Sequence, residues 1–167
     1  FRDLTQKDFK IKKKNIIKNK ISLRNIKLLK SDVFKNLELE KFDLIINDVS
    51  GISEKLLPIS SWFKNVPCNS GSDGTDLTID VLKNFKFHLN KKGKMYLPII
   101  SLSNEKKIFK FLNKNKIKYK IISQNYWPLP KELYKSVNLL DKLKSLNYIN
   151  FEKKFNMLIA KTKMIKI

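Results

Sequence analysis

The stretch "FDLIINDVSGISE", residues 42–54, decides the fold class of this chain. It begins as a hydrophobic strand and then changes abruptly to small and polar residues: Asn47, Asp48, Ser50 and Gly51. In open α/β sheets, ligands bind outside the carboxyl ends of the strands, so this strand end is a candidate site. The alternative is that Asp48 only forms a turn, as Asp often does where a strand ends.

Length and composition indicate a globular protein rather than a disordered one. The 167 residues suit a single domain over 1–167, and 42% of them are hydrophobic while 31% are charged. No apolar run approaches the ~20 residues that a membrane-spanning helix needs, so we expect no membrane segment. The single cysteine, Cys68, cannot form an intramolecular disulfide, and we expect a reducing, cytoplasmic setting.

The formal net charge of +21 has two explanations, which the sequence leaves open. Such a charge is typical of proteins that bind RNA, DNA or an acidic protein. However, the basic residues are nearly all lysine, with only Arg2 and Arg24 as arginine, and Asn and Ile are also abundant. An AT-rich coding sequence gives the same mixture, with lysines spread over solvated faces.

Hydrophobic periodicity predicts alternating helices and strands. We expect strands over 25–30, 42–47, 94–101, 117–127 and 155–164. Helices are expected over 5–19, over 104–114 with Ser103 as N-cap, over 130–146, and along the apolar stripe Leu77, Val81, Phe85 and Leu89, with Gly93 as its left-handed C-cap. This order predicts a doubly wound, Rossmann-like α/β sheet whose last two strands form an antiparallel hairpin.

Three carboxylates follow or end hydrophobic segments: Asp3, Asp32 and Asp48. We expect them to share the carboxyl edge of the sheet. One carboxylate there can accept hydrogen bonds from ribose hydroxyls, a second can bind an adenine amino group, and Asp48 would face the reacting atoms. For any one of these residues a simple turn is at least as good an explanation.

Four collinear segments resemble class I S-adenosylmethionine-dependent methyltransferases of the small-domain type, which include the release-factor glutamine and ribosomal-protein methyltransferases. "DLTQKDFKIKKKNIIKNK" is similar to their second strand end and the helix after it, and "NIKLLKSDVFKNL" is similar to their third strand. "KFDLIINDVSG" resembles the fourth strand with its N-P-P-Y-type motif, and "SGSDGTDLTIDVLKNFKFHLNKKGKMYLPI" resembles the loop, helix and fifth strand that follow.

The resemblance implies a role for each matched residue. It assigns Asp3 to the cofactor ribose, Asp32 with Val33 to the adenine, and Asn47 to the cofactor. Asp48 stands in the place of the motif's Asn, so it is the candidate catalytic residue. Ser50 and Gly51 are expected at the substrate, although Val49, Ser50 and Gly51 replace Pro-Pro-Tyr. Trp62 either supplies the missing aromatic ring or anchors its loop on the sheet.

The family's first strand and glycine-rich loop would precede Asp3, where this chain has only two residues. We therefore expect the chain to be the C-terminal part of such an enzyme, inactive by itself. The resemblance implies S-adenosylmethionine as cofactor, no metal, and methyl transfer to an amino or hydroxyl group of a small molecule or protein. The alternatives are an rRNA, tRNA or DNA methyltransferase, or a non-catalytic basic RNA-binding module; the oligomeric state is left open.

Overall fold

The computed structural model describes residues 6–22, 24, 26–29, 31–37, 39–48, 51–61, 68 and 70–167. The chain divides into two compact units, Phe1–Glu40 and Lys41–Ile167. The prediction of a single domain over the whole chain stays a prediction.

The first unit contains one α-helix, α1 (Gln6–Lys18), among its described residues. The helix expected over 5–19 is therefore confirmed to within one residue at each end. The strand expected over 25–30 is wrong for residues 26–29, which adopt no regular structure. A strand needs a neighbouring strand to pair with its backbone groups, and the described residues of this unit contain no such neighbour.

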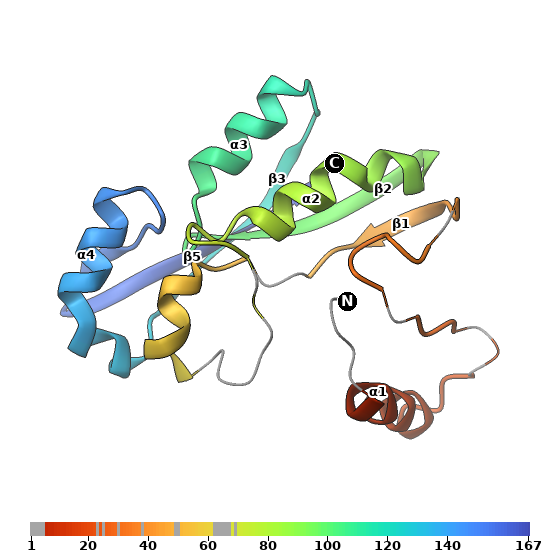
Figure 1. The fold of residues 1–167 in the computed structure, drawn as a ribbon, viewed down its shortest axis with the longest axis horizontal. Helices are drawn as coiled ribbons and strands as arrows, with labels where there is room; N and C mark the ends of the chain where they lie inside the picture. Colours follow the sequence, from red (N-terminus) through yellow and green to blue (C-terminus); the bar gives the residue numbers. More distant parts are fainter. Residues whose placement is uncertain are drawn as a thin grey trace. The chain divides into compact units, whose positions relative to one another are not determined.

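The second unit is built on one mixed sheet (Figure 1). Its five strands are β1 (Phe42–Ile46), β2 (Leu89–Ile100), β3 (Lys120–Pro128), β4 (Glu152–Lys154) and β5 (Met157–Lys166). The order across the sheet is β1-β2-β5-β3, and β4 pairs with β5 off this path. β1 and β2 run parallel, whereas β5 runs antiparallel to β2, β3 and β4. The last long strand therefore enters the sheet between β2 and β3.

Helices fill the connections between these strands. Between β1 and β2 lie the short 3₁₀ helix η2 (Glu54–Ile59), α2 (Asp76–Asn84) and η4 (Phe85–His88), and α3 (Glu105–Lys114) connects β2 to β3. The chain then forms η5 (Lys131–Ser136) and α4 (Val137–Ser145) before β4. α2 and α3 contact each other, and Figure 1 shows them on the same side of the sheet.

The start of α3 corrects one expectation. The N-cap is Asn104, whose side chain accepts a hydrogen bond from the backbone N–H of Lys107 at 3.0 Å. Ser103, the expected N-cap, lies one residue too early, and its hydroxyl donates to the carbonyl of Ile100 at 2.8 Å. Further along, α3 buries Ile108 and Leu112, which lie one turn apart.

Gly93 corrects a second expectation, because it lies inside β2 rather than at a helix end. The register between β1 and β2 shifts between the pairs Phe42–Leu89 and Leu44–Lys94, so β2 bulges beside Gly93. A Cβ atom on Gly93 would lie 2.8 Å from the carbonyl oxygen of Phe42. Glycine is therefore needed here for close backbone approach between two strands.

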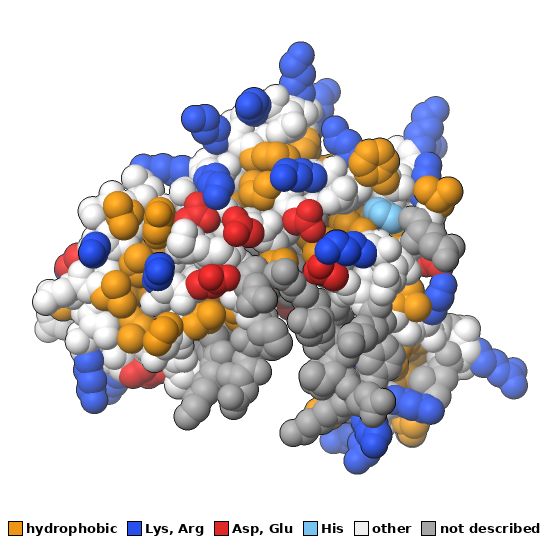
Figure 2. All heavy atoms as spheres, in the orientation of Figure 1, with side chains coloured by type: hydrophobic (Ala, Val, Ile, Leu, Met, Phe, Trp, Pro, Cys, Tyr) orange, Lys and Arg blue, Asp and Glu red, His pale blue; other side chains and the backbone are white. Residues whose placement is uncertain are grey.

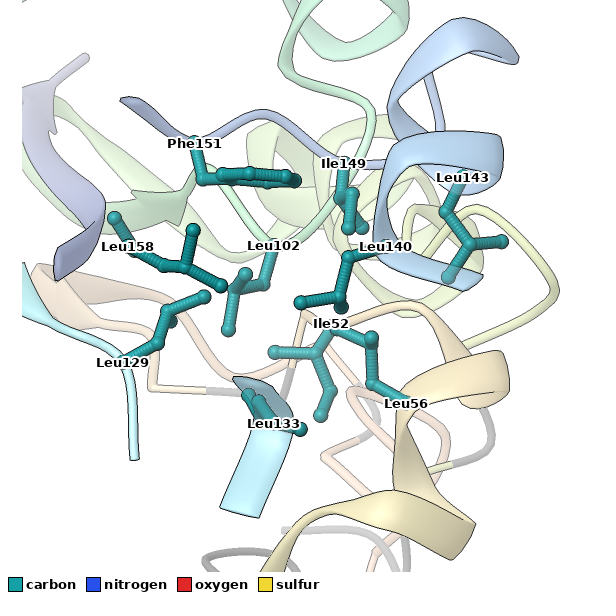
Figure 3. Close-up of a cluster of buried hydrophobic side chains, with 11 residues drawn as sticks. Ile52, Leu56, Leu102, Leu129, Leu133, Leu140, Leu143, Ile149, Phe151 and Leu158 are labelled. Atoms are coloured by element: carbon teal, nitrogen blue, oxygen red, sulfur yellow. The ribbon is translucent and has the colours of Figure 1, made fainter. Parts of the chain in front are cut away.

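One hydrophobic cluster connects the segment after β1 to the C-terminal part of the second unit (Figure 3). Ile52 and Leu56 supply the first part of it. Their partners in the cluster are Leu102, Leu129, Leu133, Leu140, Leu143, Ile149, Phe151, Leu158 and Ala160. Leu56 and Leu140 are completely buried, so close packing of apolar side chains fixes the segment that follows β1.

These observations confirm an α/β fold with an open mixed sheet and an antiparallel strand pair, β3 and β5, towards the C-terminus. The more specific doubly wound type stays a prediction. In the described part of the chain, no helix is both long and apolar enough to cross a bilayer.

Candidate functional site

Three loops of the second unit meet at the carboxyl edge of β1 and β2. The first follows β1 (residues 47–48 and 51–54), the second precedes α2 (70–75), and the third follows β2 (101–104). Because β1 and β2 are parallel, their carboxyl ends lie at the same edge of the sheet. We call these three segments the loop cluster. It occupies the position where ligands bind in open α/β sheets.

Backbone hydrogen bonds join the three loops. The N–H of Ser53 donates to the carbonyl of Leu102 at 2.8 Å, and the N–H of Asn104 donates to the carbonyl of Asp73 at 2.9 Å. Glu54 and Gly71 are joined twice: the N–H of Glu54 donates to the carbonyl of Gly71 at 3.1 Å, and the N–H of Gly71 donates to the Glu54 carboxylate at 2.8 Å. The loops therefore form one cross-linked unit rather than three independent turns.

Two glycines let the second loop approach the first. Gly71 and Gly74 have φ angles of 79° and 74°, which residues with a side chain rarely adopt. A Cβ atom on Gly74 would lie 2.4 Å from the carbonyl carbon of Ile52 and 2.5 Å from the nitrogen of Ser53. Only a residue without a side chain fits this contact.

Asp73 is the polar centre of the loop cluster. Its carboxylate accepts hydrogen bonds from the hydroxyl and the N–H of Thr75, at 2.7 and 3.2 Å, and from Nζ of Lys107 at 3.0 Å. Burial by itself raises the pKa of Asp73, but the hydrogen bonds from Thr75 and Lys107 and the charge of Lys107 outweigh it. The pKa of Asp73 therefore lies below its usual value of 3.8.

Asn47 differs from the other polar residues of the loop cluster, because its buried amide nitrogen lacks a hydrogen-bond partner among the described residues. Its backbone N–H donates to the carbonyl of Tyr96 at 2.9 Å, which continues the β1–β2 ladder. Its side chain is 9% exposed, and Nδ2 has no hydrogen-bond partner among the described residues. A buried donor left without an acceptor costs about 1–3 kcal/mol, so this amide is available to a ligand oxygen or nitrogen.

Asp48 follows Asn47 and is exposed. It makes no hydrogen bond or ion pair with other residues in the described part of the chain. Gly51, three residues further on, is half-buried at the start of the loop that carries Ser53. Asn47 and Asp48 thus follow the carboxyl end of β1 directly, and the roles predicted for Asn47, Asp48 and Gly51 stay predictions.

The other predicted site residues lie either outside the described residues or in the first unit. Asp3, Ser50 and Trp62 lie outside the described residues, and the predictions made for them stay predictions. Asp32 and Val33 belong to the first unit, where they form a turn. Asp32 accepts a hydrogen bond from Nζ of Lys35 at 2.6 Å, and Val33 has a φ angle of 55°. A common edge for Asp3, Asp32 and Asp48 likewise stays a prediction.

Sequence reasoning missed the residues that hold the loop cluster together. The resemblance assigns the segment "SGSDGT" (70–75) only to the loop before a helix. The signal that could have identified it is an acidic residue between two glycines, followed by Thr75. That pattern is typical of a tight turn with internal hydrogen bonds rather than of a helix end.

No known protein family matches this chain, and no curated protein matches it. Among the described residues, no three His, Cys, Asp or Glu side chains gather in a way that could hold a metal ion. The chemistry of the loop cluster and the resemblance in sequence are therefore the grounds for a function.

Proposed function

We propose that the protein is an S-adenosylmethionine-dependent methyltransferase that acts on an amino or hydroxyl group of a small molecule or protein. The observation that carries this proposal is the buried, unsatisfied amide of Asn47 at the carboxyl edge of two parallel strands. The four collinear segments that resemble class I methyltransferases support it. The antiparallel pairing of β3 with β5 is the one predicted from the order of the helices and strands.

The hydrogen-bonding groups of the chain suit S-adenosylmethionine as a cofactor. When bound, S-adenosylmethionine supplies an activated methyl group on a sulfonium centre. Asn47 offers an amide donor that costs nothing further to desolvate, since it is already buried. By resemblance, Asp3 would accept hydrogen bonds from ribose hydroxyls, and Asp32 with Val33 would border the adenine.

Asp48 has the properties required at the acceptor group. An exposed carboxylate accepts a hydrogen bond from the N–H or O–H of the acceptor and so orients its lone pair. Where the acceptor must lose a proton, the same carboxylate can take it. Positioning of this kind contributes up to ~7–11 kcal/mol of rate enhancement in well-oriented systems. Ser50, Gly51 and Trp62 are the residues assigned to the substrate side.

Isothermal titration calorimetry with S-adenosylmethionine and S-adenosylhomocysteine tests this proposal on the 167-residue chain. Asn47→Leu removes the amide donor while keeping a side chain of similar size. We expect about tenfold weaker binding, because one buried hydrogen bond of ~1.4 kcal/mol is lost. The melting temperature should not fall, since the free protein loses no hydrogen bond from Nδ2 among the described residues.

Asn90→Leu is the matched control. Nδ2 of Asn90 donates to Asp43 at 2.8 Å, so it also joins β1 and β2, but near the start of both strands. This variant should keep the wild-type affinity. Binding does not require catalysis, so the chain is expected to bind the cofactor through Asn47 even though it is expected to be inactive by itself. The proposed function fails if the wild-type chain binds neither compound. If both variants weaken binding equally, Asn47 is not part of the site.

A further inference from the structure

A lysine-rich cleft of about 810 Å³ lies between α3, β5 and the segment after α4. Six of the fourteen residues that line it are lysines: Lys106, Lys110, Lys114, Lys144, Lys161 and Lys163. The lining thus carries six positive charges and one negative charge, that of Glu105. Figure 2 shows Lys and Arg side chains gathered over α3, above the acidic side chains near α2.

Three of these lysines form a row along one face of α3. Lys106, Lys110 and Lys114 are four residues apart, so successive members lie about 6 Å apart along the helix axis. Nζ of Lys106 donates to the side chain of Asn147 at 2.7 Å across the cleft. Lys110 and Lys114 are exposed and have no ion-pair partner among the described residues. Two positive charges of the row are thus available to a ligand.

The acidic part of the lining does not neutralise this row. Glu105 is the single acidic residue of the lining, and its carboxylate already lies 3.1 Å from Nζ of Lys163 and 3.7 Å from Nζ of Lys161. Four asparagines also line the cleft and offer neutral donors and acceptors. The lining therefore keeps a net positive charge with hydrogen-bonding groups between the lysines.

We propose that this cleft binds the phosphate backbone of a single-stranded nucleic acid. A positively charged groove that follows one backbone is the usual way in which proteins hold single strands. An acidic protein partner fits less well, because protein–protein interfaces are poor in lysine and rich in exposed aromatic residues. Phe109, the aromatic residue of the lining, is already packed against Tyr119 and lies beneath Lys163. Without a free ring for stacking, binding should depend little on the base.

The cleft begins at Ser103 and Asn104, directly after β2. Asn104 also belongs to the loop cluster, where its N–H is bonded to Asp73. A strand lying along α3 therefore reaches the edge of the candidate site. That the bound strand carries the methyl acceptor rests on the proposed function, whereas its binding in the cleft does not.

Fluorescence anisotropy with labelled 20-residue oligouridylate and oligothymidylate tests the proposal on the full chain. The variant Lys110→Gln/Lys114→Gln should bind roughly tenfold more weakly at ~0.15 M salt. The slope of log K against log salt should become shallower by about 1.4, or ~0.7 for each lost phosphate contact. Comparison of the two oligonucleotides distinguishes RNA from DNA.

Lys91→Gln/Lys92→Gln is the matched control, because it removes the same charge from exposed positions on β2 outside the cleft. It should keep the wild-type affinity and salt slope. If both double variants lose the same affinity for the oligonucleotide, the proposal is overturned, and binding is due to general charge attraction. If polyglutamate with the same total charge displaces the oligonucleotide, the proposal is overturned in favour of an acidic protein partner. Calorimetry with S-adenosylmethionine on Lys110→Gln/Lys114→Gln should show unchanged affinity, which separates this proposal from the proposed function.

Discussion

Replacement of Gly74 by alanine should destabilise the second unit far more than the same change at Gly71. Both residues have positive φ angles, 74° and 79°, so an alanine at either position pays about 1 kcal/mol of backbone strain. The two sites differ in what the new methyl group meets. At Gly71 it meets the Asp76 side chain at 2.2 Å, and at Gly74 it meets the backbone of Ile52 and Ser53 at 2.4 and 2.5 Å.

The difference in destabilisation depends on whether the atoms that meet the new methyl group can move away from it. Asp76 is exposed, and its carboxylate can rotate away from an alanine at position 71. The backbone at Ile52 and Ser53 can move only if the loops separate, which stretches the bond from Ser53 N–H to the carbonyl of Leu102. Overpacking of this kind costs about 1–3 kcal/mol, and a weakened hydrogen bond adds ~0.5–1.5 kcal/mol. We expect about 1 kcal/mol for Gly71→Ala and about 3–5 kcal/mol for Gly74→Ala.

Equilibrium unfolding in urea, followed by tryptophan fluorescence and by circular dichroism, measures both values. The comparison is internally controlled, since both changes are Gly→Ala in the same loop at similar φ. Equal destabilisation by the two variants, or a larger effect at Gly71, would refute the claim that close packing of the loop cluster depends on Gly74.

Two further predictions concern a buried charge and a strained turn. The pKa of Asp73 is lower in the folded protein than its ordinary value of 3.8, so the stability that its carboxylate contributes is present above that value and is lost as the pH falls through the folded pKa. The difference in unfolding free energy between wild type and Asp73→Asn should therefore be constant near neutral pH and shrink below about pH 4, and a difference that grows in acid would contradict this. In the turn between β4 and β5, Phe155 and Asn156 have φ angles of 48° and 58°, and Phe155 is 91% exposed. Replacing the pair with Asn-Gly, the preferred sequence for such a turn, should raise the unfolding free energy by about 1 kcal/mol and the melting temperature by ~2–4 °C, measured by calorimetry; an unchanged or lower melting temperature would show that the Phe155 ring has a stabilising contact.

The regular elements of the second unit followed from the sequence wherever the hydrophobic pattern was unambiguous. The run Phe42–Ile46 is β1, and the expected strands at 117–127 and 155–164 overlap β3 and β5.

The error at Gly93 has a physical cause. "NKKGK" has the composition of a helix end, but Lys91 and Lys92 are exposed on β2, and the glycine relieves a close contact with Phe42. A local pattern cannot show such a contact, because the contact depends on which strand lies alongside.

The candidate site was predictable in position but not in composition. Asn47 and Asp48 could be proposed because a hydrophobic strand ends there. The role of Asp73 could not, since two of its partners, Asn104 and Lys107, lie 31 and 34 residues further along the chain. Sequence spacing gives no sign that the loops before α2 and after β2 meet.

The hydrophobic cluster around Ile52 and Leu56 also determines when the loop cluster can form during synthesis. Its partners on β5 and on the segment before β4 are made roughly a hundred residues later, which takes several seconds at ~5–20 residues per second on the ribosome. Until Phe151 and Leu158 have emerged, the polypeptide after β1 lacks much of the apolar surface against which it packs. Contacts between such distant parts of a chain form late and slow folding. The nascent chain therefore exposes this loop to proteases and chaperones until the last strands of the sheet have been made.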